Sequence, residues 1–204
     1  MRVLHTEAEL REYVREPIRM VADKDIDHID AESRRFIEAS PFFLLASAAA
    51  DGTCDVSPRG DPPGSVLVLD DHTIAFADRK GNRRADNFRN ILQRPHVGML
   101  FVIPGMAETV RVNGTARIVA EAPYLDRLAV RGATPKLAVE VRVEELYTHC
   151  GRAFARAGLW DQSTWPEKGE VPTAGELARG QTGIRLLPTR LVDAALRRGN
   201  RNQY

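Results

Sequence analysis

The sequence predicts a mainly β (α+β) fold: an antiparallel β-barrel with flanking helices. Two observations favour this class. About seven segments of strand length lie between residues 42 and 143, and only one clear helix interrupts them. A doubly wound sheet would instead alternate strands with helices throughout. Neither GxGxxG nor GxxxxGKS/T occurs, so the Rossmann and P-loop nucleotide-binding motifs are excluded.

Composition limits the classes of function. The 204 residues suit one domain with terminal additions. A formal net charge of +1 argues against a general nucleic-acid binder. Cys54 and Cys150 show no metal-ligand spacing, which favours a reduced, cytoplasmic protein. No run approaches the roughly 18 apolar residues of a membrane span, so no membrane partner is expected.

Residues 1–40 are expected to form a helical extension. The segments "EAELREYV" and "DAESRRFIEAS" have helical patterns with a modest apolar face. Asp30 is placed to cap the second helix, and Ser40-Pro41 to end it. These helices are expected to lie on a core formed elsewhere in the chain.

Strands begin at residue 42. The run "FFLLASAA", the Asp-Gly turn and "TCDVS" predict a hairpin over 42–58. Two more strands are expected within "SVLVLDDHTIAFA". Between them and the hairpin, the loop "SPRGDPPG" brings Ser57, Arg59 and Asp61 next to the basic stretch described below. These side chains either face a bound cofactor or substrate, or belong to a rigid turn.

A helix near residues 85–94 is followed by the strand "HVGMLFVI". Next, "TVRVNGTARI" alternates apolar and polar residues, and Gly114 predicts a bulge or a close approach by a ligand. A helix over 121–131, a strand in "KLAVEVRVE" and a helix over 144–157 complete the barrel domain, residues 41–157. Residues 158–204 are expected to pack on the barrel or on a partner subunit, with Trp160 and Trp165 covering the site or serving as core or interface anchors.

The stretch "ADRKGNRRADNFRN", residues 77–90, concentrates positive charge in a nearly neutral chain. Arg79 and Lys80 precede Gly81-Asn82, and Arg83 and Arg84 follow it. A helix N-terminus offers unpaired N–H groups, and arginine offers paired donors that match phosphate oxygens. The stretch therefore predicts a phosphate site. The alternative is a solvated helix face whose arginines pair with Asp78 and Asp86.

The order of a strand, a basic helix start, an apolar strand and a strand with "NGTAR" resembles the flavin-binding split barrels of the pyridoxamine 5'-phosphate oxidase-like superfamily. Its branch of "probable FMN-dependent enzymes" is the most similar, over about residues 36–143. The resemblance implies FMN as the cofactor, a split form of the barrel, and a homodimer with each flavin between two subunits. The cofactor-binding residues that it implies, taken with the neighbouring loop, are Arg59, Asp78, Arg79, Lys80, Asn82, Arg83, Arg84, Asn87, Thr109 and Arg111. Among these, Arg83 and Arg84 would hold the phosphate with Asn82 beside them, and Asn87 would face the flavin.

The chain also departs from the oxidases. The strand "SVLVLD" lacks their basic residues, and the end "LVDAALRRGNRNQY" lacks their Arg-His-Asp-Arg type of segment that holds the substrate's phosphate. The resemblance therefore implies a flavin-dependent oxidoreductase acting by hydride transfer to or from a small molecule, and these departures argue against pyridoxamine phosphate as that molecule. The alternatives are a flavin carrier or sensor without catalysis, and a barrel that holds haem or a deazaflavin. No side chain is identified as a catalytic acid or base.

Overall fold

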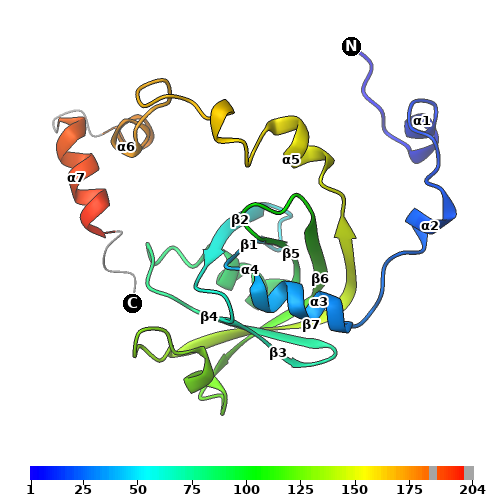
Figure 1. Cartoon of the computed structure of the whole chain (residues 1–204), viewed down its shortest axis with the longest axis horizontal. Coiled ribbons are helices and arrows are strands. Elements are labelled where there is room, and N and C mark those ends of the chain that lie inside the picture. Colours follow the sequence, from blue (N-terminus) through cyan, green and yellow to red (C-terminus); the bar gives the residue numbers. More distant parts are fainter. Residues whose placement is uncertain (184–187, 200–204) are drawn as a thin grey trace.

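The computed structural model describes residues 1–183 and 188–199. Its centre is one seven-stranded sheet with the strand order β2-β1-β5-β6-β7-β4-β3, in which all neighbours are antiparallel. The strands are β1 (Phe42–Ala48), β2 (Cys54–Gly60), β3 (Val66–Asp70), β4 (Thr73–Ala77), β5 (His96–Val102), β6 (Thr109–Ala120) and β7 (Leu137–His149). The sheet curls around a core but does not close, because β2 and β3 remain its two edges (Figure 1). The predicted split barrel with flanking helices is confirmed.

Helices flank the sheet at both ends of the chain. They are α1 (Glu7–Arg11), α2 (Arg19–Ala22), α3 (Ala31–Ala39), α4 (Asp86–Gln93), α5 (Arg152–Ala157), α6 (Ala174–Thr182) and α7 (Thr189–Gly199), with short 3-10 turns η1 (Leu125–Leu128) and η2 (Gln162–Thr164). Asp30 caps α3 by accepting a hydrogen bond from the backbone N–H of Ser33, and Ser40 ends the helix, as the sequence predicts. No helix of the described residues is long and apolar enough to cross a membrane.

The core lies on the inner face of the curled sheet. Along β1 the inward residues Phe43, Leu45 and Ser47 are buried, whereas their neighbours Phe42 and Leu44 are only partly buried. This alternation follows from the period of two residues in a strand. Two helices, α3 and α4, pack against the strands and supply buried residues such as Ile37 and Ile91. The outer face of the sheet therefore keeps partly exposed apolar side chains.

Two local predictions are confirmed at strand positions. The strands β1 and β2 form the expected hairpin, with register partners from Phe42↔Gly60 to Ala48↔Cys54. At Gly114 the register of β6 against β7 shifts, which is the predicted bulge. A Cβ atom at Gly114 would collide with the backbone carbonyl of Arg142. Only glycine fits this position without a shift of β7.

One predicted helix is wrong, and another begins later than predicted. Residues 121–131 contain only the single turn η1, and residues 144–149 continue β7 rather than beginning a helix. Glu144 and Glu145 favour helix by propensity, but the backbone pairs with β6 as far as Thr109↔His149, and Leu146 is buried in the core. Tertiary pairing therefore overrides the local preference. The helix α5 begins only at Arg152.

The C-terminal segment leaves the barrel as an arc that ends in the pair α6 and α7 (Figure 1). These helices pack closely on each other, because Gly175 lies against α7 and its backbone N–H donates to Asp193 at 2.7 Å. Nearer to the barrel, the Nε1 of Trp160 donates to the carbonyl of Met106 at 2.7 Å. The predicted boundaries of the terminal extensions stay predictions, and residues 184–187 and 200–204 of the predicted C-terminal extension lie outside the described residues.

Candidate functional site

A cavity of about 380 Å³ opens between the ends of β1, β2 and β4. Its lining brings together the loop "SPRGDPPG" and the first half of the basic stretch. The polar and charged lining residues are Ser40, Ser57, Arg59, Asp61, Ser65, Arg79, Lys80 and Asn82, and the aromatic ones are Phe43 and Phe76. We call this space the first cavity. Its predicted members Arg59, Arg79, Lys80 and Asn82 meet there from separate segments of the chain.

Arg79 is tied into the wall of this cavity. Its Nε donates to the carboxylate of Asp61 at 2.7 Å, and a terminal nitrogen donates to the carbonyl of Leu128 at 2.7 Å. The side chains of Arg79 and Asp61 are only 16% and 15% exposed. This arginine is therefore paired with Asp61, from the adjacent loop.

We call residues 79–84 the rim of the first cavity, because Arg79, Lys80, Gly81 and Asn82 line it and Arg83 and Arg84 follow directly. The side-chain oxygen of Asn82 accepts a hydrogen bond from the backbone N–H of Arg84 at 3.0 Å. Arg83 and Ala85 have φ angles of 61° and 56°, a left-handed conformation that is uncommon outside glycine and asparagine. Ala85 also precedes α4 without a side-chain cap. The helix α4 begins at Asp86, after the last arginine of the rim, Arg84.

The two arginines on the rim differ in their surroundings. The Nε of Arg84 donates to Asp86 at 2.7 Å, and Asp86 also pairs with Arg89 at 3.1 Å. The hydrogen bond from Arg84 lowers the pKa of Asp86, which keeps this carboxylate ionised. Arg83 is exposed and makes no hydrogen bond or ion pair with a described residue. Pairing with Asp86 thus engages Arg84 but leaves the guanidinium of Arg83 available to a ligand.

Arg59 has an unsatisfied donor next to the first cavity. Its guanidinium lies 5.5 Å from the ring centre of Phe88, and its Nε is buried without a hydrogen-bond partner. Burial lowers the pKa of Arg59, while nearby Asp78 opposes this effect. Burial likewise raises the pKa of Asp78, against the charge of Arg59. A buried N–H without a partner is costly, so this donor suits an acceptor from a bound molecule.

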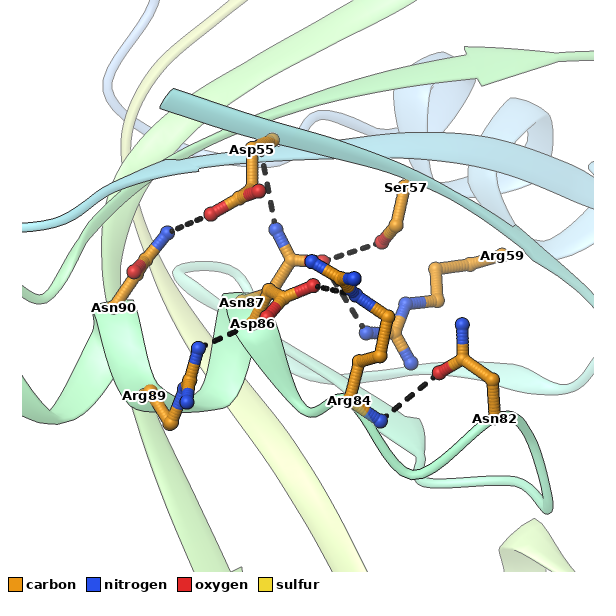
Figure 2. A network of polar contacts seen from close by, with 9 residues as sticks. All are labelled: Asp55, Ser57, Arg59, Asn82, Arg84, Asp86, Asn87, Arg89 and Asn90. Atoms are coloured by element: carbon orange, nitrogen blue, oxygen red, sulfur yellow. Dashed lines mark hydrogen bonds and ion pairs between the residues drawn. The ribbon is translucent and has the colours of Figure 1, made fainter. Parts of the chain in front are cut away.

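Asn87 lies behind the cavity in a buried polar network (Figure 2). Its side-chain nitrogen donates to the hydroxyl of Ser47 at 2.8 Å, and its oxygen accepts a hydrogen bond from Ser57. A terminal nitrogen of Arg59 approaches the same oxygen at 3.5 Å. Asn87 does not line the first cavity. Its contacts instead hold Ser57 and Arg59, which do line it.

Three members of this network, Ser47, Asp55 and Asn90, were not predicted from the sequence. Asn90 donates to Ser47 at 3.0 Å and to Asp55 at 2.9 Å, and so joins α4 to β1 and β2. Ser47 interrupts the buried face of an apolar strand, and Asn87 and Asn90 lie three residues apart on one helix. Residues with this spacing share a helix face. That combination was the available signal for a polar contact between helix and sheet.

Thr109 and Arg111 lie elsewhere in the subunit and do not line the first cavity. Arg111 pairs with Glu145 at 2.5 Å and lies 4.4 Å from the ring centre of Tyr147. Thr109 lines a second cavity, of about 360 Å³. Any contact between these two residues and a ligand of the first cavity would therefore have to come from another subunit.

The two tryptophans belong to the arc that follows α5. Trp160 contacts Phe154 edge-on with a distance of 5.9 Å between ring centres. Trp165 donates from Nε1 to the carbonyl of Leu159 at 3.1 Å and remains exposed. Neither ring lines the first cavity of its own subunit. Their contacts are those of anchors for the C-terminal segment.

The open seven-stranded sheet and the cation-lined cavity define a split-barrel protein with a site suited to an anion. The chain belongs to the pyridoxamine 5'-phosphate oxidase family: the sequence model of that name matches residues 29–150. None of the curated proteins matches the chain.

Several solved structures are similar to this one. HupZ of Group A Streptococcus is 22% identical, with 59% of this chain and 93% of that chain covered and a TM-score of 0.48. A protein named F420 reductase is 23% identical, covering 56% and 94%, with a TM-score of 0.43. An FMN-binding protein from Syntrophomonas wolfei is 12% identical, covering 56% and 82%, with a TM-score of 0.44. The family assignment rests on the sequence model alone.

Proposed function

We propose that the protein binds FMN in the first cavity and acts as a flavin-dependent oxidoreductase on a small molecule. One observation carries the proposal. Basic and polar side chains from two separate segments meet at one cavity of about 380 Å³, and the buried Nε of Arg59 has no partner there. This cavity falls within the usual range for ligand pockets, and its donor set suits a phosphorylated ligand.

The phosphate is assigned to the rim, residues 79–84. Arg83 is available there, Lys80 and Asn82 line the cavity, and Gly81 has no side chain that would obstruct a ligand. Arg84 would contribute charge while remaining paired with Asp86. Farther inside, Phe43 and Phe76 offer an apolar wall, and Ser57 and Arg59 offer hydrogen-bonding groups. When bound, the flavin would supply the hydride chemistry, and these residues would orient it and exclude water.

The same lining favours FMN over haem. Haem iron is usually held by His, Cys, Met or Tyr. None of the residues that line the first cavity is of these types. A deazaflavin shares the phosphate and the tricyclic ring system of a flavin, so the cavity lining does not discriminate against it. The mass of the extracted chromophore distinguishes the two.

A second copy of this chain is proposed as the partner. The outer side of β1 and β5 carries Phe42, Leu44 and Leu100, all only partly buried, and Val56 on β2 is 63% exposed. An apolar sheet face of this kind is typical of an interface. A homodimer through this face would cover it, and it would give Thr109 and Arg111 access to a cofactor bound by the partner. The exposed apolar face of β1, β2 and β5 therefore supports the homodimer that the family resemblance implies.

The first experiment is to purify the protein, record its visible spectrum and identify the released chromophore by mass. We expect absorbance near 450 nm, as for bound flavin, and the mass of FMN. Reduction by a nicotinamide donor under anaerobic conditions would support catalysis, whereas bound FMN without turnover would favour a carrier or sensor. A protein that does not bind added FMN would contradict the proposal.

A further inference from the structure

The inner face of β2 presents two polar side chains to the first cavity. Asp55, Ser57 and Arg59 alternate along this strand with exposed residues and lie toward α4 (Figure 2). Ser57 and Arg59 line the first cavity, whereas Asp55 does not. A hydroxyl and a guanidinium therefore follow one another along one wall of this cavity.

The side-chain amide of Asn87 has a fixed orientation behind this wall. The residue is 3% exposed, and its nitrogen donates to the hydroxyl of Ser47 at 2.8 Å and to the backbone carbonyls of Leu45 and Asp55, each at 3.4 Å. A backbone carbonyl only accepts hydrogen bonds, so an amide oxygen in the place of this nitrogen would face two acceptors. The oxygen of Asn87 therefore faces the other way, toward Ser57.

This orientation determines what the hydroxyl of Ser57 can do. A serine hydroxyl has one proton and two acceptor lone pairs. Because the oxygen of Asn87 only accepts, the hydroxyl of Ser57 donates its one proton to that oxygen, at 2.5 Å. Toward the cavity, the oxygen of Ser57 is therefore an acceptor and not a donor.

Arg59 has the opposite polarity. A guanidinium carries donors and no acceptor. One terminal nitrogen of Arg59 approaches the oxygen of Asn87 at 3.5 Å, and its buried Nε has no hydrogen-bond partner. A molecule that satisfies both residues of the wall must therefore offer a donor to Ser57 and, beside it, an acceptor to Arg59.

The ring system of a flavin has such a pair on one edge only. Its pyrimidine ring carries the N3–H group between two carbonyl oxygens, whereas the opposite, benzenoid edge carries two methyl groups. Resting on the FMN site proposed above, we propose that Ser57 and Arg59 select the pyrimidine edge of the flavin. Ser57 accepts a hydrogen bond from N3–H, and Arg59 donates to the adjacent carbonyl oxygen. With the benzenoid edge at this wall, the buried Nε of Arg59 would stay without an acceptor, which is unfavourable.

Asn87 has an indirect part in this selection. It does not line the first cavity, so it acts as a positioning residue through Ser57. Without the oxygen of Asn87, the proton of Ser57 would be free to turn toward the cavity, where it would meet the N3–H of the flavin donor to donor. The position of one buried amide thus sets the polarity of the cavity wall.

The experiment compares three flavins on the full chain: FMN, 3-methyl-FMN, in which N3 has no proton, and 8-chloro-FMN, which is altered on the benzenoid edge. Quenching of flavin fluorescence gives each affinity. We expect 3-methyl-FMN to bind about tenfold or more weakly than FMN, because the acceptor at Ser57 loses its partner. The affinity of 8-chloro-FMN should stay close to that of FMN.

A second readout separates the hydrogen bond from crowding by the added methyl group. With ¹⁵N-labelled FMN, the N3 proton of the bound flavin should exchange slowly with water and give a sharp NMR signal. Ser57→Ala should shift this signal upfield and speed its exchange, because the acceptor is removed. This measurement uses FMN itself, so no steric effect of a methyl group enters it.

Variants test the two residues. Ser57→Ala should weaken FMN but not 3-methyl-FMN, so that the preference for FMN falls toward unity. Asn87→Leu, of similar volume, frees the proton of Ser57 and should reduce the same preference. Ser163→Ala, on η2 and outside the first cavity, is the control and should leave the preference unchanged. If Asn87→Leu fails to fold, as judged by circular dichroism and Tm, the three flavins on the unaltered protein and the Ser57→Ala variant still decide.

Three outcomes would overturn this proposal: equal affinity for FMN and 3-methyl-FMN, equal weakening by the 8-chloro and 3-methyl groups, or an N3 signal that Ser57→Ala leaves unchanged. In each of them FMN still binds, so the proposed function stands. Failure of all three flavins to bind would instead contradict the proposed function, and this proposal with it.

Discussion

Arg79 and Asp61 form an ion pair in the wall of the first cavity, with 2.7 Å between the Nε and a carboxylate oxygen. Both side chains are mostly buried, and the second contact of Arg79, with the carbonyl of Leu128, fixes its orientation. The pair joins the loop after β2 to the loop after β4. The pair therefore limits the movement of these two loops, and the carboxylate of Asp61 offsets part of the positive charge in the cavity wall.

Asp61→Asn should lower the free energy of unfolding by about 1.5–3 kcal/mol, because it removes the charge of the carboxylate that pairs with the mostly buried guanidinium of Arg79. The same change should strengthen binding of FMN, since the cavity becomes more positive. Urea denaturation with and without FMN measures both effects. Asp71→Asn is the control: its ion pair with Arg34 is exposed, and its loss should cost at most about 1 kcal/mol. Weaker FMN binding by Asp61→Asn would contradict the assignment of the phosphate to this rim.

Arg83→Ala should weaken FMN binding by about 1.5–3 kcal/mol, the range for a hydrogen bond to a charged group. Its side chain is exposed and forms no ion pair with a described residue, so folding stability should change little. Quenching of flavin fluorescence gives the affinity. Arg190→Ala, an exposed arginine on α7, provides the comparison. If both variants lose equal affinity, the effect of Arg83 is only one of general charge.

His149 predicts a specific pH dependence of stability. Burial, with Arg111 and Lys24 nearby, lowers its pKa in the folded protein below the ordinary 6.5. In the window between these two values the unfolded chain binds more protons, so the free energy of unfolding contributed by His149 rises with pH and is lost as the pH falls through the folded pKa. His149→Gln should flatten the stability profile in this window, as measured by urea denaturation between about pH 5 and 7.5. The same substitution at exposed His5 should leave the slope unchanged; a steeper slope in His149→Gln would reverse the sign argued here.

Local patterns in the sequence were enough to predict much of the barrel. The alternation along β6, the hairpin turn, the cap at Asp30 and the bulge at Gly114 each depend on a few neighbouring residues. The end of β7 was predicted as helix, because the pairing of Glu145 with Asn113 that makes it a strand joins segments far apart in the chain. Periodicity therefore identified strands more reliably than it identified where they end.

The site was only partly predictable for a similar reason. The charge cluster and the loop at Arg59 could be recognised in sequence, and both reach the first cavity. The pairing of Arg79 with Asp61, and of Arg84 with Asp86, depends on how the loops fold together. Alternation predicted that Thr109 and Arg111 share a face of β6. It did not indicate that neither residue lines the first cavity of its own subunit.

Val56→Glu tests the proposed dimer. Val56 lies on the outer face of β2, is 63% exposed, and is the register partner of Ala46 on β1. A charge there would have to be desolvated in a dimer interface, so we expect a dimer to dissociate into monomers in light scattering coupled to gel filtration. Val171→Glu, a similarly exposed valine outside the barrel, should leave the mass unchanged. An unaltered protein that is monomeric at high concentration would exclude the dimer directly.

Gly114→Ala tests whether the bulge is required for pairing of the two long strands. The added Cβ would meet the carbonyl of Arg142, with the carbonyl carbon 2.9 Å away. Because this contact is with backbone of the neighbouring strand, no side chain can move aside, and overpacking should cost about 1–3 kcal/mol or more. Gly180→Ala is the matched control, since a Cβ there meets no atom within 4 Å and alanine favours the helix α6 by up to about 1 kcal/mol. Thermal unfolding of the two variants should therefore shift in opposite directions. A Tm for Gly114→Ala equal to that of the unaltered protein would mean that β6 can pair with β7 without this bulge.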